Sequence, residues 1–506
     1  MNNNFLKSVA GASIILTLLG FISKGIGFIR EIIYANKFGL SIEFDLFLIS
    51  FTIPNIINTA TIYLCQHYFI PAFNEENKVS VNNGKEFFNR TFWLFSMVGA
   101  LIAIVLFSLS GGVVKLFLST SSSENIMITN NMFSIFLITI PLNSGMSVIM
   151  AYQQAKFNFI SPAISLTLLN VIVIAGAVLL SDIINIYALP LSFGIAYILS
   201  LLFLYTRTHN DLKFIKFRSI FLRHRRTNFK IIIILIFIEG LSLSYVLIDR
   251  LFVSQLSFGG ISALNYAFVI FSLPISLFSL PLITTLFSKF STTPDNLIVD
   301  TKNAYGMILV IMLPMSIIFY NWGDLILTSF YEGGQFTSSN TYATFSVLKY
   351  YSFGLVFISV YQLFVKIFYS VKKYNYVLII SVSAIIVKAF LSAVLVNFYK
   401  EEGLALATTF LYVFLMAFAI IFLLTRIKVI NLQHLLQKFT FILITIIFIL
   451  FISQFFEGLV HLGNYWNKII SLIVFIFVYT YTLNILNDKE VSIIKFTLMR
   501  LINNNK

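Results

Sequence analysis

Charged residues inside apolar stretches are the first candidates for chemistry in this chain. The stretch FISKGIGFIREIIYANKFGL, residues 21–40, reads as a membrane-spanning helix but contains Lys24, Arg30 and Glu31. A basic residue at the centre of a membrane helix costs about 2.5–3.5 kcal/mol on insertion scales, so something must offset that cost. Lys24 and Arg30 are separated by about 600° of helical rotation and therefore lie within roughly a third of a turn of a common face. Two cations so placed are suited to binding an anion.

The composition shows which class of protein carries these charges. Of the 506 residues, 58% are hydrophobic and only 11% are charged. Soluble domains contain about 25% charged residues, so most of this surface is predicted to face hydrocarbon. Apolar runs of about 20 residues, the length that crosses a ~30 Å hydrocarbon core as a helix, recur along the chain and give about fourteen predicted spans. The predicted fold class is an all-α polytopic membrane protein.

The sequence also contains an internal repeat. A shift of 220 positions superposes residue types that are scarce in this chain, pairing Arg30 with Arg250, Gly39 with Gly259 and Pro54 with Pro274. Many transporters consist of two such repeats, which rock about a site near mid-membrane. The repeat predicts two pseudo-symmetric six-helix bundles at 1–206 and 229–426, a basic cytoplasmic linker at 207–228, and two further transmembrane helices with a cytoplasmic tail at 427–506.

The repeat places charged residues at matching depths in the two bundles. The seventh predicted span, which corresponds to the first, carries Glu239, Asp249 and Arg250. In a protein with two bundles, these faces would line a central cavity. The expected anion-binding residues are Lys24, Arg30 and Arg250. The acidic residues expected to orient them or to couple transport to cations are Glu239 and Asp249.

Two other interpretations of these charges stay open. The charged residues could form ion pairs that only hold helices together, although adjacent residues on a helix do not face one another, which argues against a pair of Arg30 with Glu31. Alternatively, Lys24 or Arg30 could extend along the helix to the membrane surface. Gly25, Gly27, Pro54 and Pro274 are candidate hinges, because small residues and helix breaks permit bending or close packing; Pro54 and Pro274 are expected to break their spans.

The distribution of positive charge predicts the topology. The formal net charge is +14, and the basic residues gather on alternate loops, above all in the run at 207–230. Such an asymmetry places the basic loops and both termini in the cytoplasm. A basic run beside a membrane also fits contact with anionic lipid, and binding to nucleic acid is not expected.

Motifs of catalysis are missing from the sequence. There is no Gly-rich phosphate loop, and the histidines are too scattered to form a metal site. The chain is therefore not expected to be an enzyme or an ATP-driven pump, and no metal or cofactor is predicted. Energy would come from the membrane potential, from sodium or from protons. A monomer is expected.

Three stretches carry a resemblance to a known family. Residues 21–58, residues 151–170 (AYQQAKFNFISPAISLTLLN) and the region 331–375, which begins YEGGQF, are similar to segments of the MurJ or MviN lipid II flippases. That family lies within the multidrug and oligosaccharidyl-lipid exporter superfamily. The similarity runs in order over nearly the whole chain.

The resemblance implies a specific function. It implies two bundles around a cationic cavity that accepts a diphosphate-linked sugar, with the last two spans forming a groove for the polyprenyl tail. Lys24, Arg30 and Asp45 match basic, arginine and aspartate positions of the family. The resemblance implies that the anion held by Lys24, Arg30 and Arg250 is a diphosphate, and that Asp45 joins the acidic residues expected to orient these cations or to couple transport to cations. The expected function is a flippase of the bacterial inner membrane that moves an undecaprenyl-diphosphate-linked saccharide by alternating access.

Departures from the family pattern leave undetermined which lipid-linked sugar the protein carries. Family members have arginines just after the proline of the second span, where this chain has Asn58 and Thr59. They also have an arginine in span eight, where LNYAFVIFSLP, residues 264–274, has none; Arg250 could supply that charge. An O-antigen or capsule unit therefore stays an alternative to lipid II. A cation-coupled multidrug exporter, or a membrane glycan polymerase or ligase, is a further alternative.

Overall fold

The computed structural model describes residues 9–119, 121–214, 229–284, 297–427, 430, 432–459 and 464–485. These residues form helices joined by short turns, and they contain no β-strand; an isolated bridge joins Gly333 to Phe336. The predicted all-α class is confirmed. Residues 215–228 of the predicted basic linker and 486–506 of the predicted tail lie outside the described residues.

The chain divides into two compact units. Unit 1 comprises Met1–Ser262 with Gly333–Thr337, and unit 2 comprises Ala263–Glu332 with Ser338–Lys506. This division differs from the sequence repeat, because the first helix of the second repeat belongs to unit 1. Common origin and contact in space are separate properties, so the repeat does not fix the unit to which a helix belongs.

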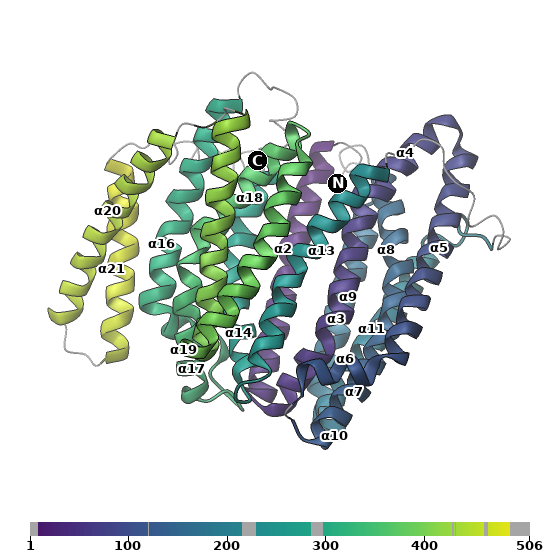
Figure 1. The fold of residues 1–506 in the computed structure, drawn as a ribbon, viewed down its shortest axis with the longest axis horizontal. Helices are drawn as coiled ribbons and strands as arrows, with labels where there is room; N and C mark the ends of the chain where they lie inside the picture. Colours follow the sequence, from purple (N-terminus) through teal and green to yellow (C-terminus); the bar gives the residue numbers. More distant parts are fainter. Residues whose placement is uncertain are drawn as a thin grey trace. The chain divides into compact units, whose positions relative to one another are not determined.

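Unit 1 is a bundle in which α9 packs on α2 and α11, and α5 packs on α8 (Figure 1). Its elements are α2 (Val9–Phe38), α3 (Ile42–Leu64), the π-helix η1 (Cys65–Phe69), α4 (Ile70–Val79), α5 (Val81–Ser108), α6 (Ser110–Phe117), α7 (Ser123–Leu137), α8 (Thr139–Ala155), α9 (Ile160–Leu179), α10 (Ser181–Ile184), the 3₁₀ helix η2 (Asn185–Tyr187), α11 (Ala188–Thr206), α13 (Phe229–Val253) and the first residues of α14 (Gly260–Pro274).

Serine residues begin several helices of unit 1. The hydroxyl oxygens of Ser41, Ser80 and Ser122 accept hydrogen bonds from backbone N–H groups in the first turns of α3, α5 and α7. A side-chain acceptor at this position satisfies an N–H group that has no partner within the helix. These serines therefore fix where three of the helices start.

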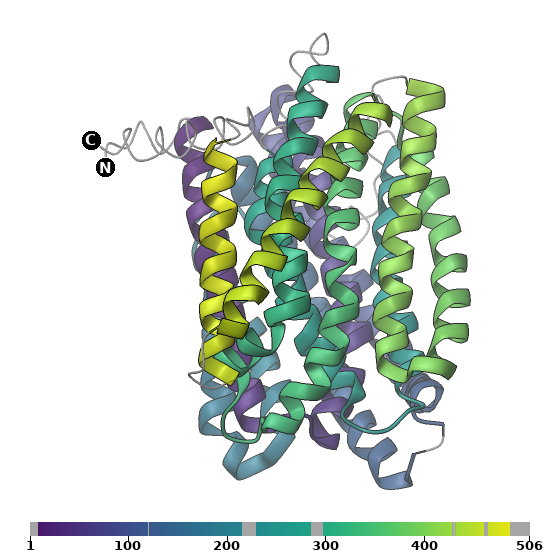
Figure 2. The same cartoon turned by 90° about the vertical axis from the view of Figure 1, so that its left-hand side faces the viewer.

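Unit 2 is organised around one long helix, α16. Its elements are the rest of α14, the π-helix η3 (Ile275–Ser279), α16 (Leu297–Tyr331), α17 (Ser338–Ser352), α18 (Gly354–Ser370), α19 (Tyr374–Phe422), the π-helix η5 (Leu423–Ile427), α20 (Leu432–Leu459) and α21 (Asn464–Ile485). Figure 2 shows α21, in yellow, lying beside α20.

Polar contacts attach the last two helices to α16. The Tyr479 hydroxyl donates to the carbonyl of Val310 over 2.7 Å, and the Tyr305 hydroxyl donates to the carbonyl of Leu435 over 3.1 Å. A salt bridge of 2.5 Å joins Lys468 on α21 to Asp324 on α16. Hydrophobic association is weak between helices in lipid, so polar contacts of this kind position helices that face hydrocarbon.

Nine helices within the described ranges are long and apolar enough to cross a membrane, or ten if the bent pair of α17 and α18 is one span. In that count, α19 and η5 form one helix, although they cover two of the predicted spans and α19 breaks at Lys400, where φ is 48°. The first, seventh and last predicted spans coincide with α2, α13 and α21. The chain is a multi-pass membrane protein.

The candidate hinges do not coincide with the breaks in the helices. The prediction that Pro54 breaks its span is wrong, because α3 continues from Ile42 to Leu64 through this proline. Pro274 ends α14 directly before η3, where the spacing of the backbone hydrogen bonds widens. Non-helical backbone angles instead occur at Trp322 in α16 and at Lys400 in α19. Neither residue could have been selected from proline or glycine content.

A glycine allows the close approach of α9 and α11. A Cβ atom added to Gly176 would lie 1.6 Å from Ser192 Oγ and 2.5 Å from Ser192 Cβ. The Ser192 hydroxyl is itself engaged, donating to the Ala188 carbonyl over 2.5 Å. The two helices can pack at this separation only because residue 176 has no side chain.

Replacing Gly176 with Ala should therefore lower the thermal stability of the purified protein in detergent. Overpacking of this kind costs about 1–3 kcal/mol, because Ser192 and the two helices must move apart. Gly194→Ala on α11 is the matched control, since a Cβ there meets nothing within 4 Å. The control should melt at or slightly above the wild-type temperature, and equal melting of both variants would contradict this account of the packing.

Candidate functional site

Arg30 lies on α2 and points into unit 1. Its Nη2 and Nε atoms donate to Glu31 Oε1 over 2.6 Å and 3.2 Å, and its Nη1 atom donates to Asn170 Oδ1 over 3.1 Å. The guanidinium also lies over the rings of Tyr34 and Phe193, 5.6 Å and 5.9 Å from their centroids. Contacts from α2, α9 and α11 thus position this cation.

The pairing of Arg30 with Glu31 corrects one expectation. The argument that adjacent residues do not face one another was wrong for this pair, because the long arginine side chain folds back to reach its neighbour. The side chain of Arg30 is still 22% exposed, and that of Glu31 is 10% exposed. Arg30 is therefore paired, while part of its side chain stays exposed.

Arg250 is buried near the end of α13. Its Nη1 atom donates to the backbone carbonyl of Ile261 over 2.9 Å, across the turn between α13 and α14. It also interacts electrostatically with Asp45. Only 8% of Arg250 is exposed, against 22% of the Arg30 side chain. Arg250 is thus much less accessible to a ligand than Arg30 is.

Asp45 connects the start of α3 to the start of α14. Its Oδ2 atom accepts from the N–H of Gly259 over 2.6 Å, and its Oδ1 atom accepts from the N–H of Ser262 over 2.7 Å and from the Ser262 hydroxyl. The first N–H groups of a helix lack partners within that helix. Asp45 therefore caps α14 from a different helix, and it is only 1% exposed.

The other predicted site residues occupy less enclosed positions. Lys24 is exposed, and Glu239 and Asp249 are half-buried. A Cβ added to Gly25 or Gly27 meets nothing within 4 Å, so neither glycine is needed for close packing. Whether these glycines act as hinges stays a prediction.

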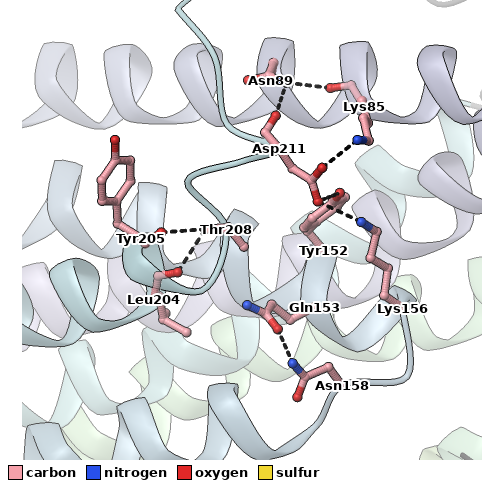
Figure 3. A network of polar contacts seen from close by, with 10 residues as sticks. All are labelled: Lys85, Asn89, Tyr152, Gln153, Lys156, Asn158, Leu204, Tyr205, Thr208 and Asp211. Atoms are coloured by element: carbon pink, nitrogen blue, oxygen red, sulfur yellow. Dashed lines mark hydrogen bonds and ion pairs between the residues drawn. The ribbon is translucent and has the colours of Figure 1, made fainter.

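A polar cluster that was not predicted lies at one end of unit 1. Figure 3 shows the Asp211 carboxylate between two lysines: Oδ1 lies 2.7 Å from Lys85 Nζ, and Oδ2 lies 2.9 Å from Lys156 Nζ. The Tyr152 hydroxyl donates to Oδ2 over 2.7 Å. Asn89 on α5 donates to the Asp211 carbonyl over 2.9 Å. The segment after α11 is thus attached to α5 and α8.

The environment of Asp211 sets its charge. Burial by itself would raise the pKa of this carboxyl, but hydrogen bonds from Lys85, Lys156 and Tyr152, with the charge of Lys156, hold the pKa well below its usual range. The carboxylate is therefore ionised at neutral pH. Asp211 is the single acidic residue in the sequence 207–228, which is the signal that could have identified it.

Comparisons with known proteins decide the family. The family model described as lipid II flippase MurJ matches residues 34–484. This chain belongs to the lipid II flippase MurJ family. The resemblance seen in the sequence is therefore confirmed.

Individual members of the MurJ family show how far the similarity extends. The chain is 26% identical to a probable lipid II flippase MurJ of Borreliella burgdorferi over 78% of this chain and 79% of that protein. It is 25% identical to a relative of the same description from Buchnera aphidicola, over 93% of each chain.

Solved structures agree with this family in fold. A structure of lipid II flippase MurJ in an inward closed conformation covers 96% of this chain, with a TM-score of 0.76 at 21% identity. An inward-facing MATE multidrug resistance transporter of the MOP superfamily covers 82% of this chain, with a TM-score of 0.62 at 13% identity. The MurJ family is a family of transporters rather than of catalytic enzymes.

Buried amides form a second polar cluster in this MurJ family member that sequence reasoning missed. The side-chain amide of Asn58 donates to Thr139 Oγ1 over 3.0 Å, and that of Asn143 donates to the Asn58 carbonyl over 3.0 Å. Both side chains are almost fully buried between α3 and α8. Asn58 was noted only because arginine is expected close to its position. Isolated amides in apolar runs are the signal that could have identified this pair.

A buried cation in unit 2 has a structural partner. Lys388 is fully buried, and its Nζ atom donates to Thr408 Oγ1 over 2.7 Å and to the Leu404 carbonyl over 3.4 Å. These contacts join the two parts of α19 on either side of Lys400. They show that a hydroxyl and a backbone carbonyl can accept hydrogen bonds from a buried lysine.

Asp45→Asn should destabilise the protein in detergent by about 1–3 kcal/mol, because the amide nitrogen cannot accept the hydrogen bonds that the carboxylate accepts. Glu43→Gln is the matched control, since Glu43 is an exposed acid in the same first turn of α3. Both variants lose the same interaction with the helix dipole, so the difference between their melting temperatures isolates the cap on α14. Equal melting temperatures would show that Asp45 does not provide this cap.

The Asp211 cluster should contribute stability that depends on pH. A pKa lowered in the folded state means that the carboxylate stabilises the fold above the unfolded pKa of about 3.9 and loses this contribution as pH falls through the folded pKa. The stability difference between wild type and Asp211→Asn should stay constant from about pH 6 to 8 and shrink below about pH 4. Thermal unfolding in detergent measures it, and a difference that is equally large at pH 3 and pH 7 would refute the assignment.

Proposed function

We propose that this chain is a flippase that moves a polyprenyl-diphosphate-linked saccharide, lipid II or a related glycan, from the cytoplasmic to the periplasmic leaflet. The observation that carries the proposal is the match of residues 34–484 to the lipid II flippase MurJ family. The positions of Lys24, Arg30 and Arg250 on α2 and α13 support it chemically, because a diphosphate requires several cationic donors.

In the proposed mechanism, Arg30 is the main ligand of the diphosphate. Its guanidinium can donate in parallel to two phosphate oxygens, which a lysine cannot do. A diphosphate would replace Glu31 as its partner, while Asn170 keeps the remaining Nη1 donor in place. Exposed Lys24 would make the first contact. Buried Arg250 would act only after the turn between α13 and α14 moves.

Acidic residues would set the geometry of these cations. Glu31 and Asp45 neutralise charge next to Arg30 and Arg250, which lowers the cost of holding guanidiniums in the membrane while no substrate is bound. Glu239 and Asp249 on α13 would couple transport to cations. The energy would come from the membrane potential, sodium or protons, and the internal duplication supports alternating access as the mechanism.

The membrane and topology are part of the proposal. A flippase for polyprenyl-linked precursors belongs in the bacterial inner membrane, and the charge asymmetry of the loops supports cytoplasmic termini. We infer a monomer that has no nucleic-acid partner. The sugar is the least constrained property, because Asn58 contributes a buried amide where relatives carry arginines close by.

A second candidate is a cation-coupled multidrug exporter. The similarity in fold to MATE transporters, with a TM-score of 0.62 for one of them, favours it. Cationic drugs would, however, be repelled by Lys24 and by any basic face that Arg30 presents. Resistance to cationic drugs in a susceptible host would distinguish the two functions.

Arg30→Ala should abolish growth in a strain depleted of its own lipid II flippase, in which wild type restores growth. The loss of two charge-assisted contacts, each worth about 1.5–3 kcal/mol, would weaken diphosphate binding at least about a hundredfold. Arg30→Lys keeps the charge but cannot donate two parallel hydrogen bonds to phosphate oxygens, so it should restore growth only in part. Lys37→Gln is the matched control on α2, because Lys37 pairs with an exposed acid, Asp182.

Membrane levels and melting temperatures of the variants should equal those of the wild type, to separate transport from folding. Full growth with Arg30→Ala would contradict the assignment of Arg30. If the wild type fails with lipid II but restores a strain that lacks its surface-polysaccharide flippase, the substrate is that glycan and the proposal for the diphosphate stands.

A further inference from the structure

The Asp211 cluster lies at the ends of candidate membrane helices of unit 1. The candidate membrane helices of this region begin at Val81 and end at Ala155 and Thr206. Lys85 lies in the first turns of α5, Lys156 directly follows α8, and Asp211 follows α11 by a short turn. The three side chains meet in one cluster, so these ends share one face of unit 1 (Figure 3).

The cluster carries an excess of donors and of positive charge. Two ammonium groups and the Tyr152 hydroxyl converge on a single carboxylate, which leaves one net positive charge. Each ammonium has three N–H groups, and the carboxylate satisfies only part of them. The side chains of Lys85 and Lys156 are each 44% exposed, and that of Asp211 is 22% exposed. An anion from outside can therefore reach the donors.

Exposed aromatic side chains lie close in sequence to Lys156 and Asp211. Phe157, next to Lys156, is 56% exposed, and Phe214 is 90% exposed. The ring of Phe214 lies 4.9 Å from that of Trp93, whose indole nitrogen donates to the carbonyl of Lys213 over 3.1 Å. Exposed aromatic residues beside lysines at a helix end match the headgroup region of a bilayer, where phosphate groups lie next to acyl chains.

We propose that Lys85, Lys156 and Tyr152 form a binding site for the phosphate group of an anionic phospholipid, and that Asp211 occupies this site as an internal competitor. A phosphate presents more acceptor oxygens than a carboxylate and satisfies the donors that Asp211 leaves over. When the phosphate binds, the Asp211 carboxylate loses its contacts with Lys85, Lys156 and Tyr152. This loss weakens the attachment of the segment from Thr208 to Phe214, while its backbone contacts with Asn89 and Trp93 on α5 remain. This site is separate from Arg30 and does not depend on the proposed transport function.

The competition takes place between two anions and needs no proton. The pKa of Asp211 is held well below its usual range by its hydrogen bonds, so the carboxylate stays ionised at neutral pH. Neutralisation of Asp211 therefore cannot release the segment under physiological conditions. Lipid composition, rather than pH, would control its attachment, and residues 215–228 directly follow it in the sequence.

Hydrogen exchange of the full chain in lipid nanodiscs tests this competition. The N–H groups of Asp211 and Leu212 donate to the Thr208 carbonyl, and that of Lys213 donates to Asn89 Oδ1. Replacing part of the phosphatidylcholine with phosphatidylglycerol should speed the exchange of these amides roughly tenfold, which corresponds to about 1.4 kcal/mol. Unchanged exchange in phosphatidylglycerol would overturn the proposal.

Variants separate a specific site from general attraction to charge. In Asp211→Asn, the same backbone amides should exchange rapidly in both lipids, because the internal competitor is weakened. For the same reason, this variant should retain more phosphatidylglycerol than the wild type in native mass spectrometry. Lys156→Gln should retain roughly tenfold less, a loss of about 1.4 kcal/mol. Lys213→Gln is the matched control, an exposed lysine in the same segment whose side chain is not paired with Asp211, and it should retain phosphatidylglycerol as the wild type does.

Three results would count against the site. Equal losses of phosphatidylglycerol in Lys156→Gln and Lys213→Gln would indicate diffuse attraction and overturn it. Unchanged retention in Asp211→Asn would remove the competitor from the proposal. Phosphatidylcholine discs that contain undecaprenyl diphosphate identify the source of the phosphate. If undecaprenyl diphosphate speeds the exchange of these amides and phosphatidylglycerol does not, the assignment to a phospholipid is overturned.

Discussion

The structure depends on one constraint: hydrocarbon supplies no water to satisfy a charge or a backbone polar group, so the protein must do so itself. Each cation described here meets this constraint differently. Arg30 uses its neighbour Glu31 and an amide on another helix, Arg250 uses a backbone carbonyl, and Lys388 uses a hydroxyl. Every one of these solutions also fixes the position of a helix or a turn. Charge in this protein is therefore both a candidate for function and a means of assembly.

Carboxylates at turns meet the same constraint by accepting hydrogen bonds from polar groups. Asp45 takes up N–H groups at the start of α14, and Asp211 gathers two lysines and a tyrosine. Glu332 accepts from the hydroxyls of Ser338, Thr341 and Thr328 over 2.7, 2.9 and 3.1 Å, which links the end of α16 to the start of α17. Asp45 reaches donors outside its own helix, whereas Asp211 and Glu332 lie between helices and accept from donors on or next to the neighbouring helices. Such contacts hold turns in place while the spans between them stay apolar.

The pairing of Arg30 with Glu31 provides a physical basis for the proposed binding of a diphosphate. A lone guanidinium in the membrane would be costly, and one locked in a fully buried ion pair could bind nothing. Arg30 lies between these extremes, because it is paired with Glu31 while part of its side chain stays accessible. Binding of a diphosphate then becomes an exchange of one anionic partner for another, which limits the desolvation needed at the binding step. The proposed lipid site at Asp211 uses the same principle at the membrane surface.

The sequence by itself determined the class of fold, the positions of most helices and the family. Hydrophobic length and the scarcity of charge are local properties, and they are sufficient to place helices in a membrane. The sequence also selected Arg30 and Arg250, because charged groups in apolar runs are rare enough to stand out, and the family resemblance added Asp45. What it could not give was the partner of each charge.

Only the tertiary structure decided those partners. It paired Arg30 with Glu31, made Asp45 the cap of a helix that is more than 200 residues away in sequence, and brought Asp211 to Lys85 and Lys156. It also showed that α3 continues through Pro54 and that α16 has non-helical backbone angles at Trp322. The physical reason is that a hydrogen bond depends on distances of about 3 Å between atoms of different helices. Periodicity along a single helix carries no information about those distances.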